Sequence, residues 1–151
     1  MNIFPPTFRA DVVATLQGVV KSLRFEHQGR NPQTGTDCAG LLLYALHVNE
    51  WEPLVPEITE SRTYTLPVDP HHLLAVMEAE CDPITLADVK PCDIVLFAKP
   101  GKLPVHLGVV TMILFERPVV LHVDEKKIVE HSLDDLYSKL VYGAYRIKGL
   151  E

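Results

Sequence analysis

The chain has 151 residues, a length that fits one globular domain and leaves no room for a second independent catalytic domain. Hydrophobic residues make up 47% of it and charged residues 23%, so the chain can bury a core and falls outside the range of disordered proteins. With 14 Lys and Arg against 20 Asp and Glu, the net charge is −6, which argues against nucleic acid as a partner and against unaided adhesion to an anionic membrane. We therefore predict a single domain over residues 1–151.

The cysteine pattern excludes two further classes of protein. Cys38, Cys81 and Cys92 are odd in number and show no CxxC spacing, so neither a disulfide framework nor a structural zinc site is indicated. No basic segment followed by an apolar stretch opens the chain, and no run of about 18 apolar residues occurs in it. We expect cytoplasmic synthesis without a signal peptide, no membrane span and no cofactor.

Three segments in the first half predict helices. After a cap at Thr7, apolar residues recur at helical spacing over residues 8–23. Asp37 is a good N-cap for an apolar helix over residues 38–48, and a third helix is expected over residues 71–80. Two segments without either period are predicted to be loops: residues 24–36 and 49–67.

The second half predicts strands, because short β-branched and aromatic runs alternate there with turn residues. The runs are Ile94–Ala98, Val105–Leu114, Val119–Val123, Lys127–His131 and Tyr142–Ile147. Helices followed by closely spaced strands indicate the α+β class with an antiparallel sheet.

Cys38 is the candidate nucleophile. It is predicted to lie in the first turn of a helix, where unpaired backbone N–H groups and the positive end of the helix dipole favour the thiolate. The alternative interpretation is a core-filling cysteine, although the position joins a polar loop to a helix. Position alone leaves both interpretations open.

Two histidines could complete a thiol catalytic site. His106 opens a predicted strand and is a candidate base, and His122 interrupts an apolar run on the next strand, where it could orient that base. Taken singly, each is as well explained as a structural histidine. Their order after Cys38 matches compact bacterial papain-like cysteine peptidases.

The sequence resembles the NlpC-type cell-wall cysteine peptidases. The resemblance rests on Gly35–Leu41, similar to the nucleophile motif, on Lys90–Phe97, similar to a Pro-Gly-Asp turn and strand, and on His106–Val110, similar to a His-hydrophobic-Gly motif. His122 fits the third polar position. The resemblance implies a papain-like α+β fold with the nucleophile at a helix N-terminus packed on a sheet of about four to six antiparallel strands, and catalytic roles for Cys38, His106 and His122.

Two further segments resemble the branch associated with phage and prophage tails. These are His27–Pro32 and the stretch from Val129 through Arg146. That likeness implies hydrolysis of peptidoglycan stem peptides between D-γ-glutamyl and a diamino acid, phage tail proteins as partners, and a virion or tail-like particle acting on the cell wall as the location.

The sequence departs from the family pattern at two positions. Cys92 stands where the turn has glycine, which is tolerable only if the position does not require positive φ. Phe25 replaces an active-site tyrosine, so Gln28 is a candidate to supply the missing hydrogen bond.

Other polar residues near the proposed site have two interpretations each. Asp37 either caps the helix or binds the substrate amine, and Arg30 either binds a peptide carboxylate or is a surface charge. The remaining histidines are interpreted as surface or structural: His27, His47, His71, His72 and His131.

Two alternatives to a peptidase remain open. A non-catalytic tail assembly module could keep the fold and bind peptidoglycan. A related amidase or acyltransferase could use the same Cys-His pair on another bond, because the loops that read the substrate are not predictable from the sequence.

Overall fold

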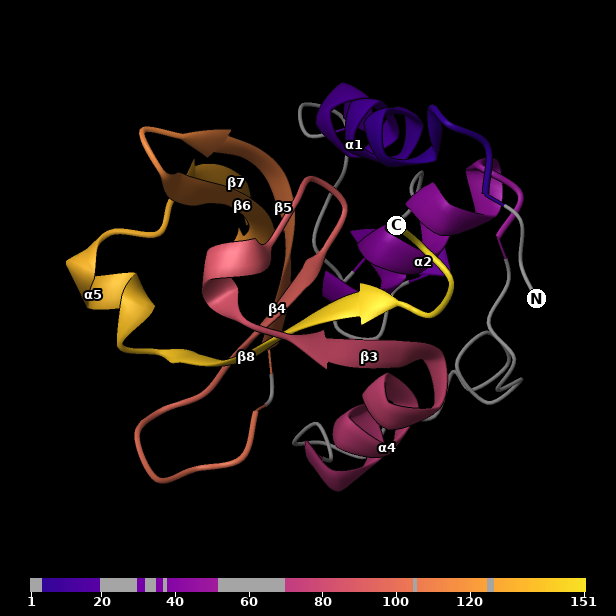
Figure 1. Cartoon of the computed structure of the whole chain (residues 1–151). Coiled ribbons are helices and arrows are strands. Elements are labelled where there is room, and N and C mark those ends of the chain that lie inside the picture. The colour runs from indigo at the N-terminus through magenta and orange to yellow at the C-terminus, as the bar shows by residue number, and fades with distance from the viewer. Residues whose placement is uncertain are drawn as a thin grey trace.

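The computed structural model places a six-stranded antiparallel sheet against helices (Figure 1) and adds a small two-stranded sheet. The fold class is α+β, with a sheet size inside the expected range. The residues that the structure describes are 4–19, 30–31, 35–36, 38–51, 70–104, 106–124 and 127–151.

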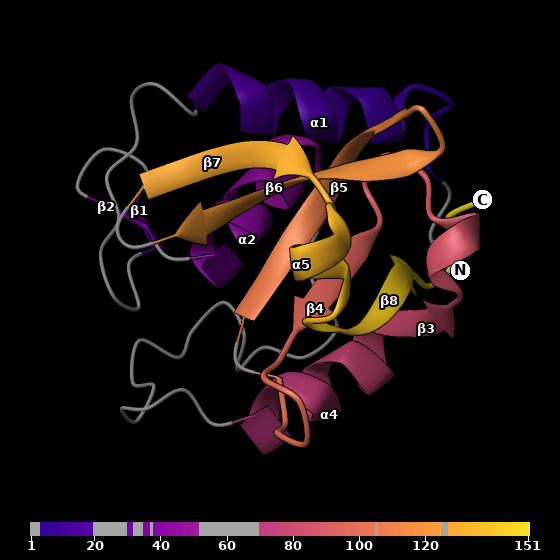
Figure 2. The ribbon, with the colours of Figure 1, turned by 90° about the vertical axis from the view of Figure 1, so that its left-hand side faces the viewer.

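The helices are α1 (Phe8–Val19), α2 (Cys38–Val48), α4 (Pro70–Glu80), the short α5 (Asp135–Ser138) and the 3₁₀ helix η1 (Leu86–Asp88). The strands are β1 (Arg30–Asn31), β2 (Gly35–Thr36), β3 (Cys81–Ile84), β4 (Ile94–Phe97), β5 (His106–Leu114), β6 (Arg117–Asp124), β7 (Lys127–Ser132) and β8 (Val141–Ile147). The large sheet has the strand order β3-β8-β4-β5-β6-β7, and β1 and β2 form the small sheet (Figure 2).

The predicted helices are confirmed where they are described. α1 begins directly after Thr7, whose hydroxyl donates a hydrogen bond of 2.8 Å to the Asp11 carboxylate. α2 has the predicted bounds, and α4 begins one residue early, at Pro70, where proline suits the first helical turn. The predicted extension of the first helix to residues 20–23 lies outside the described residues. None of the helices in the described segments is long and apolar enough to cross a membrane.

All five predicted strands form, and the structure adds β3. This strand was not predicted because it is four residues long and contains Pro83. Proline is tolerated there because β3 lies at the edge of the sheet and, among the strands that the structure describes, pairs only with β8. The predicted loop over residues 24–36 also contains structure, since Arg30 pairs with Thr36 and Asn31 with Gly35.

The sheet is buried on both faces. Along β4 the side chains alternate: Ile94 and Leu96 join a core shared with α1 and α2, whereas Val95 and Phe97 join a second core with residues from the α5 region. α1 lies across the end of the sheet formed by β5 to β7, and α4 lies beside β3 at the other end (Figure 2). A hydrogen bond of 2.9 Å from Gln17 to Glu130 joins α1 to β7.

A buried carboxylate connects the elements of the first core. Asp93 is fully buried and accepts hydrogen bonds of 2.9 Å from Arg9 in α1 and 2.7 Å from Arg146 in β8. Arg146 donates a second bond, at 3.1 Å, and the backbone N–H of Lys90 donates a fourth, at 2.8 Å. This hydrogen bonding to Asp93 raises the pKa of Arg146 above its ordinary value. The aspartate therefore ties the first helix and the last strand to the turn before β4.

Asp93→Asn should lower the free energy of unfolding by about 3 kcal/mol, because it removes the one negative charge that two partly buried arginines share. Asp135→Asn is the matched control: Asp135 is exposed and pairs with an exposed Arg117, so its loss should cost little. Urea unfolding of the two variants checks this. Equal losses of stability in both would contradict the structural role of Asp93.

Candidate active site

Two of the predicted site residues meet on neighbouring strands. The Nε2 atom of His106 lies 2.8 Å from the Nδ1 atom of His122, a hydrogen-bonding distance. Gly108 on β5 pairs directly with His122 on β6, and His106 stands two residues before Gly108. Because side chains two residues apart share one face of a strand, the antiparallel register places the two imidazoles diagonally across the sheet.

Gly108 is required here for close packing. A Cβ atom at this position would lie 3.1 Å from Cε2 of Phe97 and 3.3 Å from Cβ of His122. Both distances are shorter than ordinary van der Waals contact. The glycine two residues after the histidine therefore leaves the space in which Phe97 and His122 approach the strand.

Two aromatic rings hold the histidine pair. The Phe97 ring centroid lies 5.6 Å from that of His106 and 5.8 Å from that of His122. The Tyr137 ring lies 5.8 Å from His122 in an edge arrangement and also contacts Phe97, with 6.3 Å between the two ring centroids. His122 is buried, so its ring orientation is fixed by these contacts rather than by solvent.

A third histidine, which the sequence pattern predicts to be a surface or structural residue, joins the pair. Nε2 of His131 on β7 lies 2.6 Å from Nε2 of His122, and Nδ1 of His131 lies 2.9 Å from the carbonyl oxygen of Ser132. The Tyr137 ring lies 4.4 Å from the His131 ring. The half-buried His131 therefore continues the hydrogen-bonded line begun by His106.

A signal for His131 was present in the sequence. Asp124 and Lys127 pair at the β6–β7 turn, and counting back along the hairpin pairs His122 with Val129. His131 then shares a face with Val129 and lies diagonal to His122. Register counted from the short connection between the predicted strands Val119–Val123 and Lys127–His131 would have brought the two histidines together.

Cys38 is the first residue of α2, as predicted, and α2 packs against β5, the strand that His106 begins. The position of its thiol is outside the described part of the structure, so its role stays a prediction. Asp37 and Gln28 also lie outside the described residues, as does Phe25. Arg30 is described as the first residue of β1, without its side chain.

The other two cysteines are buried and poorly suited to thiolate chemistry. Burial raises the pKa of Cys81 to about 12 and likewise that of Cys92 to about 12, so both are neutral thiols at physiological pH. Cys92 has φ of +83°, so the condition under which it could replace glycine without strain is not met. Its side chain fills the first core and its N–H donates to Val110 O at 2.7 Å, which holds this conformation.

The remaining histidines take no part in this cluster where they are described. His47, in the last turn of α2, and His71, in α4, are exposed. His27 and the side chain of His72 are outside the description. Within the described segments, no three His, Cys, Asp or Glu side chains are arranged to hold a metal ion.

No protein-family model matches the chain, and no curated protein matches it either. Solved structures with a similar fold do match the chain. One is an NLP/P60 family protein from Staphylococcus aureus described as similar to a lipoprotein, with a TM-score of 0.66 and 14% identity over 97% of this chain. A second is the NlpC/p60 domain of the peptidoglycan hydrolase SagA, with a TM-score of 0.62 and 16% identity over 92% of this chain.

The chain has the NlpC/P60 fold. A third structure, an NLPC/P60 family protein from Bacillus cereus, agrees with a TM-score of 0.66 and 14% identity over 96% of this chain. This chain spans 98% of the SagA domain but only 43% of the Staphylococcus aureus protein and 41% of the Bacillus cereus protein. The NlpC/P60 fold confirms the predicted papain-like architecture.

The two buried thiols predict a loss of stability at alkaline pH. The folded state keeps each thiol proton up to about pH 12, whereas the unfolded chain releases it near the ordinary value of 9.0. Between these values the free energy of unfolding should fall by up to about 1.4 kcal/mol per pH unit for each thiol.

Urea unfolding at several pH values above 9.0 measures this slope. Cys92→Ala should reduce the slope of the free energy of unfolding against pH by the contribution of one thiol, and Cys81→Ala should do the same. Burial also raises the pKa of Tyr145, with a smaller contribution from Cys81. Tyr145 therefore cancels from the comparison with Cys92→Ala, which makes that variant the cleaner test. An unchanged slope in both variants would contradict the burial of these thiols.

Proposed function

We propose that this chain is a cysteine peptidase that hydrolyses amide bonds of peptidoglycan stem peptides. The observation that supports it most is the hydrogen bond between His106 and His122, within a fold shared with NlpC/P60 domains. A base oriented by a second polar side chain is what thiol hydrolysis needs. Cys38, at the start of the helix that packs on the same strand, is the proposed nucleophile.

The hydrogen bond assigns the working nitrogen of the base. Nε2 of His106 is engaged with Nδ1 of His122. His106 therefore acts on the thiol through its own other ring nitrogen, Nδ1. Transfer of the thiol proton to Nδ1 gives a thiolate and an imidazolium. The helix N-terminus favours the thiolate, since backbone N–H groups and the helix dipole stabilise negative charge there.

Hydrolysis then proceeds in two steps. The Cys38 thiolate attacks the scissile carbonyl carbon, and the backbone N–H of Cys38 stabilises the resulting oxyanion, an effect of about 3–4 kcal/mol for one such donor. His106 returns its proton to the leaving amine as the C–N bond breaks, which leaves a thioester. Water, deprotonated by His106, attacks the thioester and releases the acid and the free thiol.

The proposed substrate bond joins D-γ-glutamyl to a diamino acid. The motifs that resemble the cell-wall peptidases support it, and one structural neighbour is described as a peptidoglycan hydrolase. Asp37 is proposed to read the substrate amine, with Gln28 and Arg30 as further substrate contacts. A guanidinium such as that of Arg30 can bind a peptide carboxylate through two parallel N–H groups.

We propose further that a phage or tail-like particle delivers the enzyme to the wall. The resemblance of the segments around His27 and Val129 to tail-associated peptidases supports this location. The net charge of −6 is in keeping with it, because the protein's own field would repel an anionic wall.

The rate of Cys38 alkylation by iodoacetamide against pH tests the proposed chemistry without a substrate. A thiolate–imidazolium pair predicts fast labelling at about pH 5–6 that collapses in His106→Ala. Cys81 and Cys92 are internal controls that should label slowly in the folded protein, because burial raises the pKa of each to about 12.

Labelling of Cys38 that rises only near about pH 8.5, as for an unperturbed thiol, would contradict the peptidase proposal. That outcome would favour the non-catalytic binding module. If labelling is fast but stem peptides are not cut, the related amidase or acyltransferase chemistry becomes the better account.

A further inference from the structure

The line of three imidazoles ends on a group that can only accept a hydrogen bond. His106, His122 and His131 are joined by contacts of 2.8 Å and 2.6 Å, and Nδ1 of His131 lies 2.9 Å from the carbonyl oxygen of Ser132. A neutral imidazole has one donor nitrogen and one acceptor nitrogen, whereas a backbone carbonyl only accepts. The carbonyl therefore determines which ring donates and which accepts at each hydrogen bond between the three imidazoles.

This order of donors and acceptors fixes the tautomer of each neutral ring in turn. Because Ser132 O accepts, His131 carries its proton on Nδ1 and presents a bare Nε2. His122 then donates from Nε2 to His131 and accepts at Nδ1. His106 accordingly donates from Nε2 and keeps the lone pair on Nδ1, the nitrogen proposed to take the thiol proton.

We infer that His131 is a positioning residue that, through His122, holds His106 in the tautomer required of the base. This inference rests on the proposed function and adds to it a residue outside the Cys-His-His set. When Nδ1 of His106 gains the thiol proton, no other proton in the line has to move, because Nε2 already donates to His122. The opposite tautomers would place a proton on Nδ1 and leave His106 unable to accept another there.

The end of the line is held in place by the fold. Ser132 pairs with Val119 on β6, and the N–H of Leu133 donates to Pro118 O at 2.9 Å. These contacts fix the carbonyl that orients His131. The Tyr137 ring packs 4.4 Å from the His131 ring and limits its rotation. A surface histidine would lack both constraints.

Nitrogen-15 NMR of the three side chains tests the assignment directly. We would use Cys38→Ala, which removes the thiol, at about pH 8, above the ordinary histidine pKa of about 6.5. The proton-bearing nitrogen should be Nε2 in His106 and His122 and Nδ1 in His131. His131 protonated on Nε2, or His106 protonated on Nδ1, would overturn the inference.

A matched pair of variants tests the coupling. Gln and Met have similar shapes, but only Gln offers an acceptor to Nε2 of His122. In the Cys38→Ala background, His131→Gln should keep the proton of His106 on Nε2, whereas His131→Met should shift the 15N signals of His106 towards the other tautomer. Identical His106 signals in the two variants would overturn the inference.

With Cys38 present, His131→Met should slow the alkylation of Cys38 at about pH 6 about tenfold, and His131→Gln should stay close to the unsubstituted protein. Equal losses in both would mean that His131 only supports the fold. If His131→Met does not fold, the tautomers of the native rings and of His131→Gln still decide. Slow alkylation of Cys38 in the unsubstituted protein would contradict the peptidase proposal instead. The tautomers found by NMR do not depend on that result.

Discussion

The register of β5, β6 and β7 is the constraint on which the site depends. Side chains alternate between the faces of a sheet, so a slip of one residue would turn a histidine to the opposite face. In the observed register, Gly108 pairs with His122 and His122 pairs with Val129, which sets the three imidazoles in one diagonal line. The space left by Gly108 admits Phe97 and His122 together. The chemistry proposed here follows from strand pairing as much as from residue identity.

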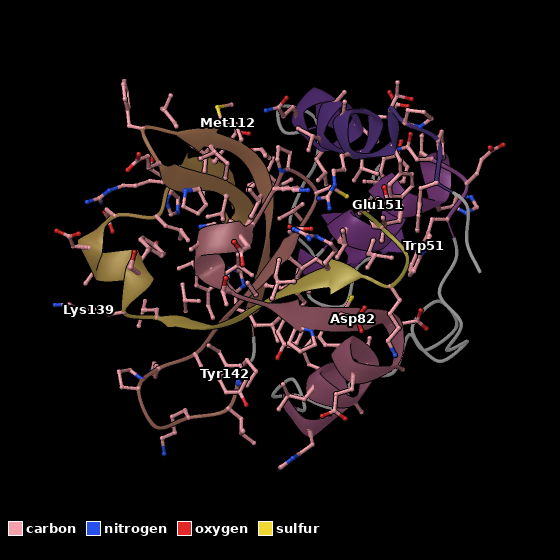
Figure 3. The ribbon with its side chains drawn as sticks, viewed as in Figure 1. Trp51, Asp82, Met112, Lys139, Tyr142 and Glu151 are labelled. Carbon is pink, nitrogen blue, oxygen red and sulfur yellow. The ribbon has the colours of Figure 1, made fainter. Side chains whose placement is uncertain are left out.

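A second constraint fixes this part of the sheet relative to the helices. Asp93 is buried between two arginines from opposite ends of the chain, and its carbonyl accepts from Val110 N at 2.8 Å. The turn before β4 is thereby attached to β5, although it contains the positive φ of Cys92. By contrast, Met112 on the same strand points outward near the far end of the β5–β6 hairpin (Figure 3), where the chain is exposed and carries no part of the site.

Helices and strands with a strong local pattern could be predicted from the sequence, whereas features that depend on strand pairing could not. The apolar run after Asp37 and the β-branched run from His106 were strong enough to give α2 and β5 nearly residue by residue. β3 was missed because four residues containing Pro83 carry too little pattern, and pairing with β8 decides their conformation. His131 was missed for a related reason, since nothing local distinguishes it from an exposed histidine until the hairpin register is known. At Cys92, the sequence indicates that the residue is strained if its φ is positive, but the sign of φ is known only from the backbone of the structure.

The most direct test of the central claim is mass spectrometry of a purified stem peptide containing a D-γ-glutamyl–diamino acid bond after incubation with the protein. We predict two new fragments from cleavage of that bond, formed by the unsubstituted chain and absent with Cys38→Ala. Fragments formed equally by Cys38→Ala, or no cleavage by a chain whose Cys38 alkylates rapidly, would contradict the assignment of a stem-peptide peptidase.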